Sequence, residues 1–250
     1  MLDAVRKSIV WTGFALVSMA PAWSPALAQQ APEPCGPLTS SFGPYDYRTA
    51  DAPTKHIVES NHFAPGVEAL IGGQTGTIGG DLGYVLAVFP NHHRALISMM
   101  NLGAKLKAPQ APGAKFSVDC YFNRALRFKY NDAIVHMIHA KHLAGTGRRP
   151  EALKELEVAA DLDKTNGFTQ YNVGLIYLEM NEWERALAQA HSALALEFTR
   201  TALKDKLVAT KHWREPPAGA LPAAGAASAS APAPDAASAA QPAMAASAPR

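Results

Sequence analysis

Three histidines have the types and spacing that could support metal chemistry. His136, His139 and His142 recur at every third position of one predicted helix. The first two share a face, so a metal ion could bridge their rings. No cysteine or carboxylate lies at ligand spacing nearby in the sequence, and the helical register points His136 and His139 towards neighbouring helices. The sequence therefore favours interhelical packing of these rings over a metal site.

A glycine cluster at residues 72–83, GGQTGTIGGDLG, invites comparison with phosphate-binding loops. That mechanism needs a Lys-Ser/Thr ending and a preceding apolar strand, and this segment has neither. We interpret residues 72–83 as a flexible loop between helices, and the alternative is a mobile lid over a groove. The adjacent His92 and His93 diverge on a helix, so we expect them at a helix start, where they cap the helix or face solvent.

Cys35 and Cys120 are the two cysteines of the chain. Their separation of 85 residues excludes a Cys-x-x-Cys redox pair. In an exported protein the compartment permits a disulfide between them, and two free thiols are the alternative.

The chain carries none of the common catalytic motifs. It has no Gly-x-Ser-x-Gly and no His-Glu-x-x-His segment. A formal net charge of +2 is too weak to indicate nucleic-acid binding. We therefore expect a protein that is not an enzyme, that needs no cofactor or metal, and that has no nucleic-acid partner.

The two ends differ in composition from the middle. Arg6 and Lys7 precede an apolar run at 8–20, and Ala26-Leu27-Ala28 has the small-x-small pattern of a cleavage site. This pattern predicts a signal peptide at 1–28 and a mature protein in the periplasm or secreted, with no membrane span after cleavage. The apolar run is short for an uncleaved anchor. The alanine- and proline-rich residues 216–250 predict a disordered tail.

The middle of the chain contains an internal repeat of 34 residues. Residues 133–166 and 167–200 each hold two segments with apolar residues at helical spacing, joined by a short polar turn. Small residues correspond at this shift, as in Ala140 with Gly174 and Ala152 with Ala186. Small side chains at these positions predict two antiparallel helices in close contact.

These two units resemble the tetratricopeptide (TPR) repeat family. The second unit carries the motif residues Tyr171-Asn172-Val173-Gly174, Tyr177, Trp183, Ala186, Ala193, Leu194 and Leu196, and the first carries Ala140, Gly147, Glu151-Ala152, Ala159, Leu162 and Asp163. The family's closing proline is replaced by Lys164 and Phe198. The resemblance implies an all-α, right-handed solenoid.

The resemblance is weaker upstream of residue 133, and a capping helix is expected downstream of residue 200. Residues 61–132 are interpreted as two degenerate helix pairs, with helices expected at 61–71, 81–90, 91–106 and towards 128. Together with the two clear repeats they make about four helix pairs. Residues 29–60 are interpreted as an irregular N-terminal arm, and residues 201–215 as a capping helix.

The family resemblance also implies a binding groove on the inner face of the first helices. Carried over to this chain, the groove residues are Met137, Lys141, Phe168, Tyr171, Asn172, Leu175 and Glu179. Their aromatic and aliphatic character favours an apolar peptide. The expected function is a non-catalytic scaffold that binds a protein or peptide of the cell envelope. The alternative is an envelope protein that binds a metal or small ligand through His136 and His139 or through the loop at 72–83.

Overall fold

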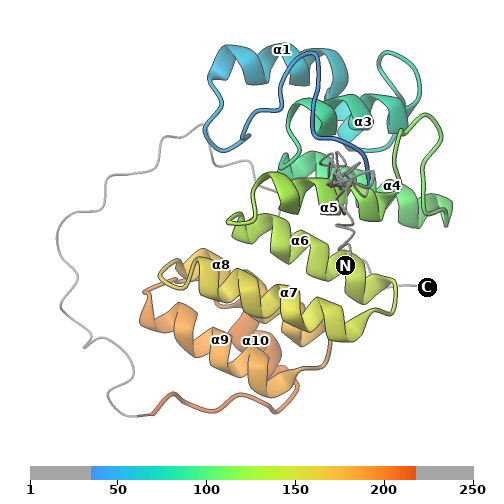
Figure 1. Cartoon of the computed structure of the whole chain (residues 1–250). Coiled ribbons are helices and arrows are strands. Elements are labelled where there is room, and N and C mark those ends of the chain that lie inside the picture. The colour runs from blue at the N-terminus through green and yellow to red at the C-terminus, as the bar shows by residue number, and fades with distance from the viewer. Residues whose placement is uncertain (1–34, 218–250) are drawn as a thin grey trace, which may run out of the picture. The chain divides into compact units, whose positions relative to one another are not determined.

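The computed structural model describes residues 35–217, and every regular element in that range is an α-helix (Figure 1). The prediction of an all-α protein is confirmed. The predicted signal peptide and nearly all of the predicted tail lie outside the described residues. The helices are α1 (Ala52–His62), α2 (Pro65–Glu68), α3 (Ile78–Val88), α4 (His93–Leu106), α5 (Val118–Phe128), α6 (Ala133–Gly145), α7 (Arg149–Leu162), α8 (Gly167–Glu179), α9 (Trp183–Ala195) and α10 (Ala202–Ala209).

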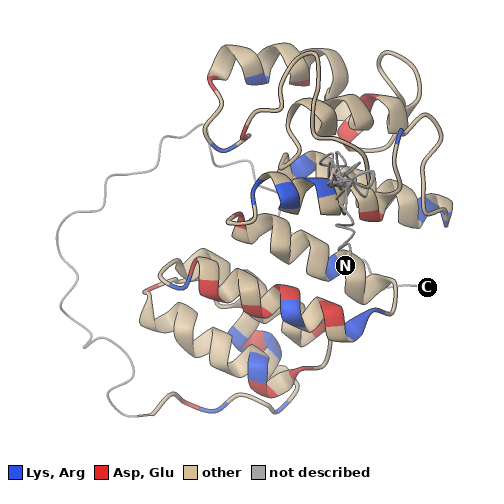
Figure 2. Ribbon diagram, in the orientation of Figure 1, with Lys and Arg blue, Asp and Glu red and all other residues tan. Residues whose placement is uncertain are grey.

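Helices α6 to α9 form two helical hairpins. Helix α8 begins at Gly167, 34 positions after α6 begins at Ala133, and each first helix packs closely on the helix that follows it. The contact positions are small, as predicted: Ala152 and Ala186 are fully buried. A Cβ atom on Gly174 would lie 2.5 Å from Leu203 Cδ2 of α10, so a larger residue here would force the Leu203 side chain to move. Ion pairs such as Arg185–Glu157 cross from α9 to α7 on the outside (Figure 2).

The N-terminal arm is more helical than the sequence suggested. Helix α1 begins at Ala52, inside the segment interpreted as irregular, because the Asp51 carboxylate accepts the Thr54 N–H and Pro53 fits the first turn. The helix expected at 61–71 is not formed. Helix α1 ends at His62, and Pro65, which lacks an N–H, starts the separate short helix α2.

The glycine-rich segment is only half a loop. The Thr77 hydroxyl accepts the Gly80 N–H, so α3 starts at Ile78 and includes the last glycines of residues 72–83. Gly79 is buried against the loop before α5, where an added Cβ would lie 2.4 Å from the Pro112 carbonyl oxygen. The prediction of a loop is therefore wrong for residues 78–80, and the helix expected from residue 81 begins three residues earlier, because Thr77 caps it and Gly79 allows a close approach.

Two hydrophobic clusters hold the helices together, and α6 belongs to both. Val135 and Ile138 of α6 lie in the first cluster, with side chains of α1 to α5. Met137 and Ala140 lie in the second, with side chains of α7 to α10. The C-terminal helix α10 closes the second cluster through Leu203 and Leu207.

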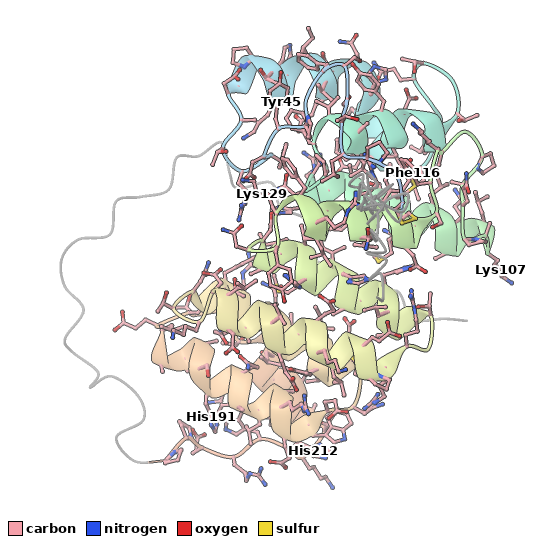
Figure 3. All side chains as sticks on the ribbon, viewed as in Figure 1. Tyr45, Lys107, Phe116, Lys129, His191 and His212 are labelled. Atoms are coloured by element: carbon pink, nitrogen blue, oxygen red, sulfur yellow. A yellow bond between two sulfur atoms is a disulfide. The ribbon has the colours of Figure 1, made fainter. Side chains whose placement is uncertain are left out.

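A disulfide between Cys35 and Cys120 anchors the start of the described chain to α5 (Figure 3). Next to it, the Arg124 guanidinium donates to the carbonyl oxygens of Cys35 and Pro37, at 3.1 and 2.6 Å. Further along, the Tyr45 N–H donates to the Val88 carbonyl oxygen at 2.8 Å. Residues 35–50 are thus fixed at both ends although they contain no helix.

A buried polar cluster joins this arm to the start of α6. Asn91 is fully buried, and its side-chain amide donates to Asp132 at 2.9 Å and to Asp46 at 2.7 Å. The Asp132 carboxylate also accepts a hydrogen bond from His93 Nε2 at 2.9 Å. It lies 3.4 Å from the Arg48 guanidinium and caps the N-terminus of α6. Burial alone would raise the pKa of Asp132, but these partners outweigh it and hold the pKa below its usual range.

His92 is the N-cap of α4 and is fully buried, so its predicted capping role is right and solvent exposure is wrong. Its Nδ1 accepts the Ala95 N–H, which requires that Nε2 carry the hydrogen that is donated to Glu59 at 3.0 Å. This tautomer is neutral. Burial lowers the pKa of His92 below its usual value of 6.5, and the nearby Glu59 only partly opposes this.

This arrangement predicts acid destabilisation that begins at mildly acidic pH. Below about pH 6.5 the unfolded chain takes up a proton on His92 while the folded protein does not, so the free energy of unfolding should fall as the pH drops towards the folded pKa. Urea unfolding at pH 7.5 and 5.5 measures the fall. The control is His92→Asn, since asparagine caps a helix but does not titrate. Its stability should depend less on pH, and an unchanged dependence would contradict the role of His92.

Candidate functional site

The predicted groove residues lie on the neighbouring helices α6 and α8, and the structure divides them into two groups. Met137 and Tyr171 are only 2% and 6% exposed and belong to the second hydrophobic cluster. In the structure these two side chains lie beneath the surface, whereas the prediction placed them in direct contact with a partner. Both side chains turn inward, into the cluster that residues of α7, α9 and α10 complete.

The remaining five predicted residues reach the surface. We call them the α6–α8 face: Lys141, Phe168, Asn172, Leu175 and Glu179. Lys141 Nζ lies 3.4 Å from Glu179 Oε2, so an ion pair links α6 to α8. Both side chains are partly solvated, so the pair contributes little stability and mainly fixes charge positions.

Phe168 and Leu175 lie on α8, separated by about two helical turns, and Asn172 lies between them. The Asn172 amide nitrogen donates to the Phe168 carbonyl oxygen at 2.7 Å. This side-chain bond within the helix leaves the amide oxygen as the group that a partner could use. The α6–α8 face thus offers two apolar side chains, one acceptor and one ion pair.

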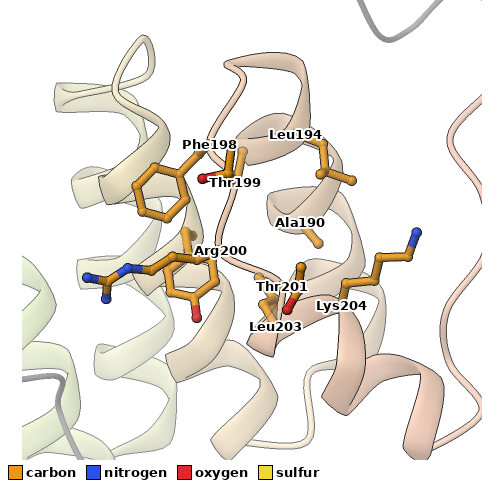
Figure 4. A pocket seen from close by; sticks show the side chains of 10 residues that line it. Ala190, Leu194, Phe198, Thr199, Arg200, Thr201, Leu203 and Lys204 are labelled. Carbon is orange, nitrogen blue, oxygen red and sulfur yellow. The ribbon is translucent and has the colours of Figure 1, made fainter. Parts of the chain in front are cut away.

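Beyond Phe168 the face continues to a small pocket between α8, α9 and α10 (Figure 4). Phe198 forms its upper wall, with ring centroids 6.3 Å from Phe168 and 5.1 Å from Tyr171. Arg200 and Lys204 lie at its mouth, on either side of Thr201. Its volume of about 40 Å³ has room for a small group and not for a whole side chain.

Sequence reasoning missed Phe198, Arg200 and Lys204 as part of this surface. Phe198 and Arg200 lie at the end of the second repeat, in the connection between α9 and α10, and Lys204 lies in α10. The available signal was Phe198 itself, an aromatic residue in place of the closing proline of the repeat. A bulky ring where the resemblance predicts a proline indicates a local packing role.

The histidine pair is bound to a carboxylate from the next helix. Glu155 of α7 lies 2.5 Å from His136 Nδ1 and 3.3 Å from His139 Nδ1. Burial alone would raise the pKa of Glu155, but the hydrogen bond with His136 and the nearby His139 ring lower it to about 2. His136 Nε2 also lies 2.7 Å from the Tyr130 carbonyl oxygen, so both of its nitrogens face acceptors. The sequence shows no carboxylate at ligand spacing from these histidines, and the fold brings Glu155 to them from another helix.

This geometry favours the packing role that the sequence indicated. A metal needs a ring nitrogen with a free lone pair, whereas both nitrogens of His136 are directed at protein acceptors. Within residues 35–217, no three or more His, Cys, Asp or Glu side chains come together in a geometry that would hold a metal ion.

The loop before α3 is folded over a buried carboxylate. Asp81 accepts the N–H groups of Gln74 and Thr75, at 2.6 and 3.1 Å, and the Thr75 hydroxyl at 2.5 Å. Its burial would raise the pKa of Asp81, but these donors and His62 lower it, so the carboxylate is ionised. The loop amides that would bind a phosphate are therefore already bound to an anion of the protein, which argues against both the phosphate loop and the mobile lid.

No protein-family model matches this chain, and no curated protein is similar to it.

The described helices include none that is both long and apolar enough to cross a membrane.

Proposed function

We propose that this protein is an exported, non-catalytic scaffold that binds a protein or peptide of the cell envelope across the α6–α8 face. Helices α6 to α9 would be two repeats of the tetratricopeptide type. The identical 34-residue offset of α6 to α8 and of α7 to α9, together with the small residues at their contacts, supports this assignment.

The observation that carries the binding proposal is the set of side chains that α8 presents. Phe168 and Leu175 are partly exposed on a helix whose backbone is rigidly packed on α9, so ordering costs little when a partner binds. Partly exposed aromatic and aliphatic side chains on such a surface are typical anchors for a partner. The Lys141–Glu179 pair at one end, and Arg200 and Lys204 at the other, provide a polar rim.

The proposed compartment has two supports. The sequence at 1–28 has the pattern of a signal peptide, and a disulfide between Cys35 and Cys120 persists in oxidising compartments such as the periplasm. The proposal of an exported protein therefore rests on independent features at opposite sides of the expected cleavage site.

Site-specific photocrosslinking tests the proposed face. A photoreactive phenylalanine analogue at position 175 should give a discrete adduct with an envelope protein, and the added substitution Phe168→Ala should reduce the yield at least about tenfold, as expected for loss of an aromatic anchor. The matched control carries the analogue at Ile71, which is 83% exposed in the N-terminal half. The same adduct from positions 71 and 175, or no adduct from 175, would contradict binding at the α6–α8 face.

A further inference from the structure

A second pocket, of about 240 Å³, lies in the N-terminal half, far in sequence from the α6–α8 face. Phe42 of the arm, Ile57, Val58, Asn61 and His62 of α1, and Tyr84 of α3 line it. Drug-sized ligands occupy pockets of roughly 300–1,000 Å³. The smaller volume here suits a single large amino-acid side chain.

The walls of this pocket are apolar side chains left in contact with water. Phe42, Ile57 and Tyr84 are 37%, 56% and 43% exposed, and the similarly exposed Tyr45 lies next to Phe42 with ring centroids 5.4 Å apart. Single exposed apolar residues are normal, whereas several that surround one hollow mark a binding site. Two aromatic walls and one aliphatic wall favour a flat, aromatic occupant.

Two polar residues of the pocket, His62 and Asn61, present acceptors. His62 Nδ1 lies 3.0 Å from the buried Asp81 carboxylate, which can only accept, so Nδ1 carries a hydrogen. In the neutral ring, Nε2 is then an acceptor and points away from Asp81. The Asn61 amide nitrogen donates to the Ile57 carbonyl oxygen at 2.7 Å, which leaves the Asn61 oxygen for a ligand. A matching occupant therefore carries a hydrogen-bond donor at its edge.

We propose that this pocket binds a tyrosine or tryptophan side chain of a partner polypeptide, with the phenol O–H or indole N–H donated to His62 Nε2 or to Asn61. Both side chains combine a flat apolar ring with one donor at the edge. Phenylalanine fills the same volume but leaves the acceptors unpaired.

The pocket is already formed before anything binds. The Cys35–Cys120 disulfide and the Tyr45–Val88 hydrogen bond hold the arm that carries Phe42. On the opposite wall, the His62 ring stacks on Tyr84 with centroids 4.1 Å apart. Because little must be ordered on binding, a single side chain can bind measurably.

The test uses N-acetylated, amidated amino acids as probes, titrated into the oxidised chain (residues 29–250) and followed by NMR of backbone amides. The tyrosine and tryptophan probes should shift the amides of residues 57–62 and 84, with at least about tenfold higher affinity than the phenylalanine probe, which lacks the donor. In the double variant His62→Phe/Asn61→Ala, which removes both acceptors and keeps a ring against Tyr84, this preference should fall towards onefold. In Ile57→Asp, an exposed position, binding of all three probes should be lost.

Ile71→Asp is the matched control, since it adds the same charge at another exposed position, and it should leave every affinity unchanged. Equal affinity of the tyrosine and phenylalanine probes would overturn the proposal. The proposal would also be overturned by amide shifts that map to other residues, or by the absence of any shift. Tighter binding of N-acetylated, amidated lysine than of the aromatic probes would overturn it too. These results do not depend on the α6–α8 face, so either site can fail without the other.

Discussion

Replacing both cysteines, in Cys35→Ala/Cys120→Ala, should lower the free energy of unfolding by about 4 kcal/mol. The disulfide closes a loop of 85 residues. In the chain-entropy account, removing a crosslink of that span lets the unfolded chain explore many more conformations, while the folded state keeps most of its contacts. The expected loss is a large part of the stability of an ordinary domain.

The structural effect of the double substitution should be confined to the N-terminal half. Arg124 donates to the Cys35 and Pro37 carbonyl oxygens, and hydrogen bonds such as these must hold the start of the arm once the sulfur link is gone. We therefore expect faster hydrogen exchange at Tyr45, whose N–H is bonded to Val88, than at the amides of α8.

Urea unfolding of the oxidised protein, the reduced protein and the double variant measures the effect. Reduction of the wild type should reproduce the loss seen in the variant, and a reductant should do nothing further to the variant itself. A loss below about 1 kcal/mol in both would show that the crosslink restricts the unfolded chain far less than its span predicts.

Asp132→Ala should be the most damaging substitution of a single polar residue, with a loss of about 3–5 kcal/mol. The side chain is 1% exposed and accepts from Asn91 and His93, next to Arg48. Alanine would leave the buried Asn91 amide, and the partly exposed His93 and Arg48, without the anion that they surround. It would also remove the N-cap of α6, which by itself is worth about 1 kcal/mol.

The repeat supplies a matched control for this prediction. Asn166 is the N-cap of α8, 34 positions after Asp132, and it accepts the Phe168 N–H at an exposed site. Asn166→Ala should therefore cost only the cap, about 1 kcal/mol. Asp132→Asn keeps a capping oxygen and should fall between the two. Equal losses from Asp132→Ala and Asn166→Ala would mean that the buried partners contribute nothing beyond the cap.

The four repeat helices were predictable from the sequence because their signals are local. Apolar residues recur at helical spacing between 133 and 200, and the turns contain glycine, asparagine and charged residues. The N-terminal half was less predictable. Asp51 and Pro53 do mark the start of α1, but the apolar periodicity after them is too weak to predict a helix.

The parts of the sites that the sequence did not reveal depend on contacts across the fold. Glu155 reaches His136 from 19 positions away, on another helix. The pocket near His62 needs Phe42 from the arm and Tyr84 from α3, and nothing in the spacing of these residues brings them together. Burial of Met137 and Tyr171 likewise follows from how neighbouring helices pack, which periodicity alone does not specify.

The position of α6 in both hydrophobic clusters limits how this chain can be divided. An expression fragment that begins after α6 would lose Met137 and Ala140 from the second cluster, and one that ends before it would lose Val135 and Ile138 from the first. Repeats in a regular array are interchangeable units, but this helix has two different faces, each shaped for one neighbour. Engineered insertions of a repeat therefore belong on the C-terminal side of α9, where α6 keeps both α7 and α8 as neighbours.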